Sequence, residues 1–172
     1  MADFLPAFEK MILNEGGYRL THISGDRGGQ TYAGIARNAW AKWEGWSAID
    51  RGETPSADLV RSFYREHFWS ALQGDALVSA PVAQTLFDFA VNAGVRTAVI
   101  LAQTVVGVTP DGNLGPKTLV ALNAADAEKF ILAYALAKIA RYAQIVTKDR
   151  SQQKFLLGWV NRTLGSLKEL AA

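Results

Sequence analysis

Hydrophobic residues recur along most of the chain at intervals of three and four positions, the period of an amphipathic helix. The first such stripe contains Phe4, Leu5, Phe8, Met11 and Ile12. Gly16 and Gly17 follow it and predict the end of that helix, because glycine tolerates the left-handed backbone found there. Alternating apolar and polar runs are scarce, so residues 19–36 are expected to be irregular. The pattern predicts an all-α fold.

Capping residues and prolines mark where further helices are expected to begin. Thr54 and Pro55 predict an N-cap and a first-turn proline, with an apolar stripe that extends to Phe68. Ala80 and Pro81 predict the next start, for a helix over about 82–92. The other expected helices are a short one within 38–46 and longer ones over 95–106, 116–122, 125–147 and 151–170.

The composition favours a packed globular chain. Of 172 residues, 49% are hydrophobic and 20% are charged, enough apolar surface to exclude disorder as the main state. Cysteine is absent, which excludes disulfide scaffolds, thiolate zinc sites and cysteine nucleophiles. His22 and His67 are far apart in sequence, so we expect neither a metal nor a cofactor. A formal charge of +2 is too small to indicate nucleic acid as a partner.

The N-terminal residues do not read as a targeting signal. Residues 1–14 include the acids Asp3 and Glu9 and lack the basic stretch and apolar core of a signal peptide. No run approaches the roughly 18 consecutive apolar residues that span a bilayer. We therefore expect synthesis in the cytoplasm and no stable membrane insertion. A site of action outside the cytoplasm would require a separate means of release.

Glu15 is the residue that most suggests chemistry. It follows Phe4 by about three full helical turns and is expected on the same face as Phe4 and Phe8. Burial there and the negative end of the helix dipole would both favour the protonated carboxyl, the form that a general acid needs. Gly16 and Gly17 would let a bulky substrate approach closely. The spacing alone leaves open an ordinary glutamate that reaches into water at a helix end.

Separated motifs resemble a known family. The first is Asn14-Glu15-Gly16-Gly17-Tyr18, followed by GDRGGQTYAGI at 25–35. Tyr64 and Trp69 match an aromatic helix further along the chain. Phe87-Asp88, Asn92-Ala93-Gly94 and GVTPDGNLGPKTL at 107–119 resemble a second region. In this order, the motifs resemble the glycoside hydrolase family 108 muramidases, which are lysozyme-like in fold and cleave peptidoglycan, followed by a predicted peptidoglycan-binding region.

The resemblance implies a division of the chain and roles for individual residues. Residues 1–91 would be the catalytic muramidase region, with a helical extension over 92–172 packed on it. Residues 92–122 would either bind the wall or complete the helical core. Glu15 would donate the proton to the glycosidic oxygen. The residues expected to contact substrate are Gly16, Gly17, Tyr18, Gly28, Gly29, Thr31, Tyr64 and Trp69.

Asp26 is the candidate for the second carboxylate that glycoside hydrolysis normally uses. It could act as a base toward water or stabilise positive charge on the sugar, or it could only form a turn in a glycine-rich loop. Thr31 could hold the water instead. The sequence departs from the family pattern at 19–22, where Asn and Asp are frequent. It departs again at Tyr32 and Ala33, where many members have a polar residue and then Tyr.

The activity implied is hydrolysis of the β-1,4 bond between N-acetylmuramic acid and N-acetylglucosamine. The expected partner is the peptidoglycan glycan strand, and the protein is expected to be a monomer. The resemblance permits phage-type lysis after release by a holin, or a muramidase that assists a secretion system, either one acting in the periplasm. The alternatives are a non-catalytic peptidoglycan-binding protein and a chitinase-like or chitosanase-like carbohydrase.

Overall fold

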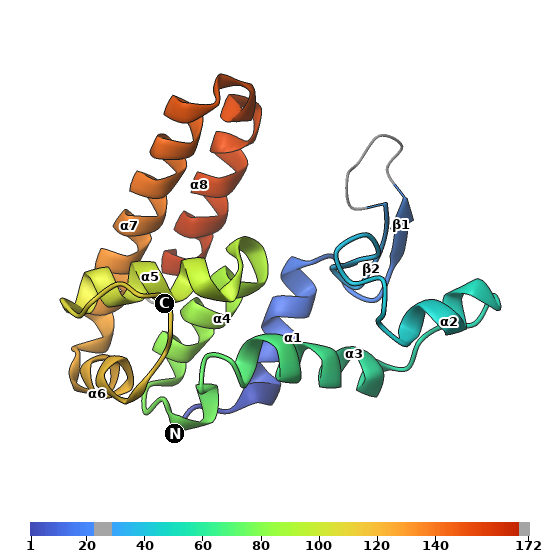
Figure 1. Ribbon diagram of the computed structural model, residues 1–172, viewed down its shortest axis with the longest axis horizontal. Helices are drawn as coiled ribbons and strands as arrows, with labels where there is room; N and C mark the ends of the chain where they lie inside the picture. The colour runs from blue at the N-terminus through green and yellow to red at the C-terminus, as the bar shows by residue number, and fades with distance from the viewer. Residues whose placement is uncertain (23–28, 169–172) are drawn as a thin grey trace. The chain divides into compact units, whose positions relative to one another are not determined.

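The computed structural model describes residues 1–22 and 29–168, which form two compact units (Figure 1). The N-terminal unit comprises Asp3–Ala71. The C-terminal unit comprises Leu72–Ala172 together with Met1–Ala2. Within the described residues the chain is predominantly helical, which confirms the predicted fold class, and it also contains one small sheet.

The N-terminal unit combines helices with a three-stranded antiparallel sheet in the order β1-β2-β3. Thr31 of β2 lies opposite Thr21 of β1 and Ala36 of β3. The elements are α1 (Phe4–Asn14), β1 (Leu20–His22), β2 (Gln30–Tyr32), β3 (Ile35–Ala36), α2 (Gly45–Asp50), α3 (Ala57–Tyr64) and a π-helical turn, η1 (Arg65–Trp69). The expectation of irregular structure over 19–36 is therefore wrong, since strands of two or three residues are too short to produce a recognisable alternation.

Helix α1 follows the predicted amphipathic pattern. The side chain of Asp3 caps it by accepting a hydrogen bond from the backbone N–H of Leu5 at 3.1 Å. Its buried face consists of Phe4, Ala7, Phe8, Met11 and Ile12. Leu5, which the stripe included, is 46% exposed. Gly16 and Gly17 have φ values of +87° and +76°, as predicted for the residues that leave the helix.

Helix α3 begins two residues later than the sequence predicts. Its N-cap is Ser56, whose Oγ accepts from the N–H of Leu59, so the prediction of a cap at Thr54 is wrong. Pro55 lies outside the helix, and its carbonyl accepts a 3.4 Å hydrogen bond from the Tyr32 hydroxyl. The bond joins the sheet to the start of α3.

The tryptophan-rich segment packs as an aromatic cluster. The ring centroid of Trp43 lies 5.3 Å from that of Trp46 and 6.1 Å from those of Tyr32 and Phe63. Trp46 also donates from its indole N–H to the carbonyl of Trp40. These contacts fasten α2 and its preceding turn to the sheet and to α3.

The C-terminal unit is built from helices. Helices α4, α5 and α7 pack together, and α8 runs antiparallel beside α7 (Figure 1). Its elements are a 3₁₀ turn η2 (Gly74–Ala76), α4 (Ala80–Ala93), α5 (Val95–Val106), α6 (Pro116–Ala124), α7 (Ala127–Lys148), a 3₁₀ turn η3 (Arg150–Gln152) and α8 (Gln153–Lys168). Each predicted helix of this region is present. Glycines with positive φ lie at the two predicted breaks, Gly94 and Gly107.

Helix α7 is long and apolar enough, by length and composition, to cross a membrane. Its Phe130, Ile131 and Tyr134 are each at most 3% exposed and belong to the core of the C-terminal unit. A core helix passes the same length test, so this property carries no membrane assignment.

Candidate active site

Glu15 lies at the point where the chain leaves α1. Its N–H donates to the carbonyl of Met11 at 3.0 Å, which fixes the residue to the last turn of the helix. The next two N–H groups, of Gly16 and Gly17, donate to the carbonyls of Leu13 and Ile12. Glu15 is half-buried, whereas the sequence placed it on the fully buried face. The residue is therefore partly exposed, while its backbone is held by the last turn of α1.

The turn between β2 and β3 packs against the Glu15 side chain. Both residues of this turn have positive φ, +50° for Ala33 and +80° for Gly34, as a type I′ hairpin turn requires. A Cβ atom on Gly34 would lie 3.1 Å from Cγ of Glu15 and 2.5 Å from the hydroxyl oxygen of Tyr64. Only glycine therefore fits between the glutamate and the tyrosine.

Tyr64, at the end of α3, contacts this turn through its hydroxyl. The hydroxyl donates to the carbonyl of Ala33 at 2.7 Å, and the residue is 1% exposed. Trp69 is also 1% exposed, and its ring packs 5.6 Å from that of Phe4. Neither ring has a face open to a sugar, so the packing does not support the predicted contact of Tyr64 and Trp69 with substrate. Their rings belong to the core.

The remaining predicted site residues have different surroundings. Tyr18 is 41% exposed and directly follows the glycine pair after Glu15. Thr31 is half-buried on β2. Gly29 has a φ of +68°, and a Cβ there would lie 3.2 Å from the side chain of Asn38. Asp26 and Gly28 lie outside the described residues.

The sequence-based hypothesis missed the contribution of Ala33 and Gly34. Both fall inside the motif that carries the family resemblance, but nothing in their residue types pointed to a contact with Glu15. The signal that could have found them is the glycine of Ala33-Gly34 between Tyr32 and Ile35, two residue types common in strands, because glycine at such a place is typical of a tight hairpin.

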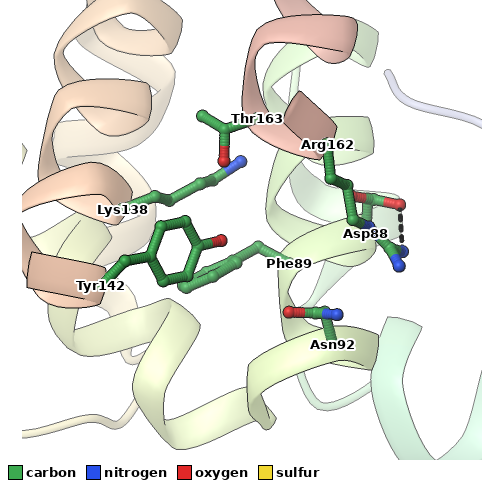
Figure 2. Close-up of a pocket in the computed structure, with 7 residues that line it drawn as sticks. All are labelled: Asp88, Phe89, Asn92, Lys138, Tyr142, Arg162 and Thr163. Carbon is green, nitrogen blue, oxygen red and sulfur yellow. Dashed lines mark hydrogen bonds and ion pairs between the residues drawn. The ribbon is translucent and has the colours of Figure 1, made fainter. Parts of the chain in front are cut away.

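A second group of polar residues lines a small cavity in the C-terminal unit (Figure 2). We call it the Lys138 cluster. The lining residues are Asp88, Phe89 and Asn92 of α4, Lys138 and Tyr142 of α7, and Arg162 and Thr163 of α8. The volume open to the centre of a water molecule is about 10 Å³, room for roughly one water. The cavity is too small for a sugar ring.

Lys138 is the most buried charge of this cluster. It is 3% exposed, and its Nζ donates to Oγ1 of Thr85 at 3.1 Å and lies 4.8 Å from the ring centroid of Tyr134. Burial lowers the pKa of Lys138 from 10.5 to about 8, against an opposing effect of Asp88. The carboxylate of Asp88 forms a 3.0 Å ion pair with the guanidinium of Arg162. These contacts join α4, α7 and α8, so the Lys138 cluster has a structural role.

No metal site is found among the described residues, where no three His, Cys, Asp or Glu side chains are grouped to hold an ion. The imidazole of His67 packs against aromatic rings, with its centroid 4.7 Å from that of Trp40 and 4.8 Å from that of Phe63. The histidine therefore contributes to the aromatic cluster.

Comparison with known proteins assigns the family. Residues 8–94 match the model of glycosyl hydrolase 108, and residues 97–164 match that of a predicted peptidoglycan domain. The chain belongs to the glycosyl hydrolase 108 family. The solved structure of Brucella abortus SagA is similar, with 29% sequence identity and a TM-score of 0.74 over 96% of this chain and 92% of that one. No curated protein matches the sequence.

This glycosyl hydrolase is thus a lysozyme-like glycosidase, and its family matches imply that it acts on peptidoglycan. The two family matches meet between residues 94 and 97, whereas the compact units divide after Ala71. Helix α4 therefore falls within the hydrolase match by sequence and within the C-terminal unit by packing. The proposed regions 1–91 and 92–172 stay a prediction.

Proposed function

We propose that this glycosyl hydrolase cleaves the β-1,4 bond between N-acetylmuramic acid and N-acetylglucosamine in peptidoglycan, with Glu15 as the general acid. The observation that most supports this role is the position of Glu15. It is half-buried, anchored to the end of α1, and packed against the Gly34 backbone. The carboxyl of a fixed and partly exposed residue can protonate the leaving oxygen of a bound glycan.

Hydrolysis of a glycosidic bond needs a second group besides the acid. We assign this role to Asp26, either as a base that activates water or as a group that stabilises the charged sugar. Thr31, on β2, is the alternative group to position the water. The anomeric form of the first product distinguishes retention from inversion. No cofactor enters this mechanism.

Substrate binding is proposed to use Tyr18 and the glycines of the two N-terminal motifs. Tyr18 is 41% exposed, so its ring can stack on a sugar. Gly16, Gly17, Gly28 and Gly29 carry no side chains, which allows a glycan to approach the backbone. The domain at 97–164 is proposed to hold the enzyme on the wall.

Two biological roles are compatible with this chemistry. We propose a monomer made in the bacterial cytoplasm and released to the periplasm, where it serves either phage-type lysis through a holin or muramidase-assisted secretion. A neighbouring holin gene would favour the first role, and neighbouring secretion genes would favour the second.

The test compares Glu15→Gln with Glu9→Gln, a matched change at an exposed position on α1. Glu15→Gln should lower turnover of purified sacculi by about 10²- to 10⁴-fold, the usual contribution of a general acid, while wall binding and the unfolding midpoint stay near wild type. Glu9→Gln should behave as wild type. Unchanged turnover in Glu15→Gln would exclude Glu15 as the acid.

Analysis of the products identifies the bond. Mass spectrometry of reduced fragments should find N-acetylmuramic acid at each new reducing end. N-acetylglucosamine there would contradict the proposal. Wild-type protein that binds sacculi and releases nothing would support the alternative, a non-catalytic protein that binds peptidoglycan through the domain at 97–164.

A further inference from the structure

The turn that contacts Glu15 has an unfavourable backbone. Ala33 has a φ of +50°, in the left-handed region where a Cβ atom crowds the backbone. Glycine, asparagine or aspartate is the usual residue at the first position of such a hairpin turn. Alanine keeps this conformation only when the surrounding structure holds it there.

Two hydrogen bonds hold Ala33. Its N–H donates to the carbonyl of Arg19 at 3.2 Å, in the segment that follows Glu15 and the glycine pair. Its carbonyl accepts from the hydroxyl of Tyr64 at 2.7 Å. Ala33 and Tyr64 are each 1% exposed, so water does not readily replace the second bond. The Tyr64 hydroxyl thus connects the end of α3 to the turn.

The side chains of Tyr64 and Glu15 both pack against Gly34 of this turn. A Cβ on Gly34 would lie within 3.2 Å of both the Tyr64 hydroxyl and the Glu15 side chain. A shift of the turn would therefore change the packing surface of Glu15. The aromatic ring of Tyr64 cannot shift freely, because it packs 5.2–5.9 Å from those of Phe8, Phe63 and Phe68.

We infer that Tyr64 is a positioning residue for Glu15: its hydroxyl fixes the carbonyl of Ala33 and thereby holds Gly34 against the side chain of Glu15. This inference rests on the proposed role of Glu15 as the general acid. Tyr64 acts without contact to the sugar. Its contribution is to keep the acid at the correct place when substrate is bound.

The test is Tyr64→Phe, which removes one oxygen and keeps the ring in the core. We expect kcat on sacculi to fall about 10- to 100-fold, as displacement of a reacting group does, with KM and wall binding unchanged. The matched control is Tyr32→Phe. Tyr32 is also buried, and its hydroxyl also donates to a carbonyl, that of Pro55. Tyr32→Phe should leave kcat within about twofold of wild type.

Three outcomes would overturn the inference: an unchanged kcat in Tyr64→Phe, an equal loss in both tyrosine variants, or a loss that only follows the folded fraction. Should Tyr64→Phe fail to fold, Gly34→Ala disturbs the same contact from the turn. It should lower kcat with KM retained, and an unchanged kcat would likewise overturn the inference. Glu15→Gln is measured in parallel. Full activity in Glu15→Gln would contradict the proposed function. An inactive Glu15→Gln together with a fully active Tyr64→Phe would contradict only the role of Tyr64.

Discussion

In the N-terminal unit, Glu15 is half-buried against a backbone turn, whereas in the C-terminal unit Lys138 is 3% exposed among helices. Glu15 is held by its own backbone and by a neighbouring turn, and the residue stays partly exposed at the end of α1. The ammonium of Lys138 is engaged by Thr85 and by aromatic rings. The comparison teaches that burial alone does not identify an active site. What matters is whether the fixed group still reaches a substrate.

The largest effect expected in the C-terminal unit comes from Asp88→Ala. The Asp88 carboxyl is paired with Arg162 at 3.0 Å and also favours the charged form of Lys138. Its removal leaves two cations close together, so we expect the free energy of unfolding to fall by about 2–3 kcal/mol, less than for a fully buried pair because Arg162 is partly exposed. Urea unfolding measures this loss. A stability equal to wild type would show that the ion pair does not hold the helices.

The next effect is a dependence of stability on pH. Lys138 has a pKa of about 8 in the folded chain against 10.5 when unfolded, so between these values the unfolded chain binds more protons. The free energy of unfolding should therefore rise with pH, by about 2 kcal/mol between pH 8 and pH 10. Burial raises the pKa of Tyr134 and Tyr142, which opposes this gain above about pH 10. Lys138→Met should abolish the rise measured between pH 8 and 10, and a rise retained in the variant would assign it to another group.

The smallest effect is expected from Arg51→Ala. Arg51 and Glu53 form a 2.8 Å ion pair whose side chains are 60% and 58% exposed. Exposed pairs of this kind contribute little, so the midpoint of urea unfolding should stay close to that of the wild type. A larger loss would show that surface pairs also hold the N-terminal unit.

The sequence predicted the parts of the fold that rest on long periodic patterns. The helices of the C-terminal unit and the buried face of α1 follow from the spacing of apolar residues. The end of α1 follows from Gly16 and Gly17. The sheet was missed because its strands have only two or three residues each. Such short strands form because they pair with each other, and a local sequence pattern does not predict that pairing.

Contacts between distant residues account for the other differences. Tyr64 and Trp69 carry the aromatic type that binds sugars, but the same type fills cores, and only their packing distinguishes the two. The bond from Tyr64 to Ala33 joins positions 31 residues apart. A lysine on a helix is usually exposed to solvent, yet neighbours on α4 bury Lys138. Long-range packing therefore determined what these residues do.

The most direct test of the account measures turnover of sacculi by Glu15→Gln and Lys138→Met side by side, with wall binding and folding measured on the same samples. We expect a turnover loss of at least about 10²-fold in Glu15→Gln and a turnover within about twofold of wild type in folded Lys138→Met. Activity retained in Glu15→Gln, or lost equally in a folded Lys138→Met, would contradict the assignment of the chemistry to Glu15.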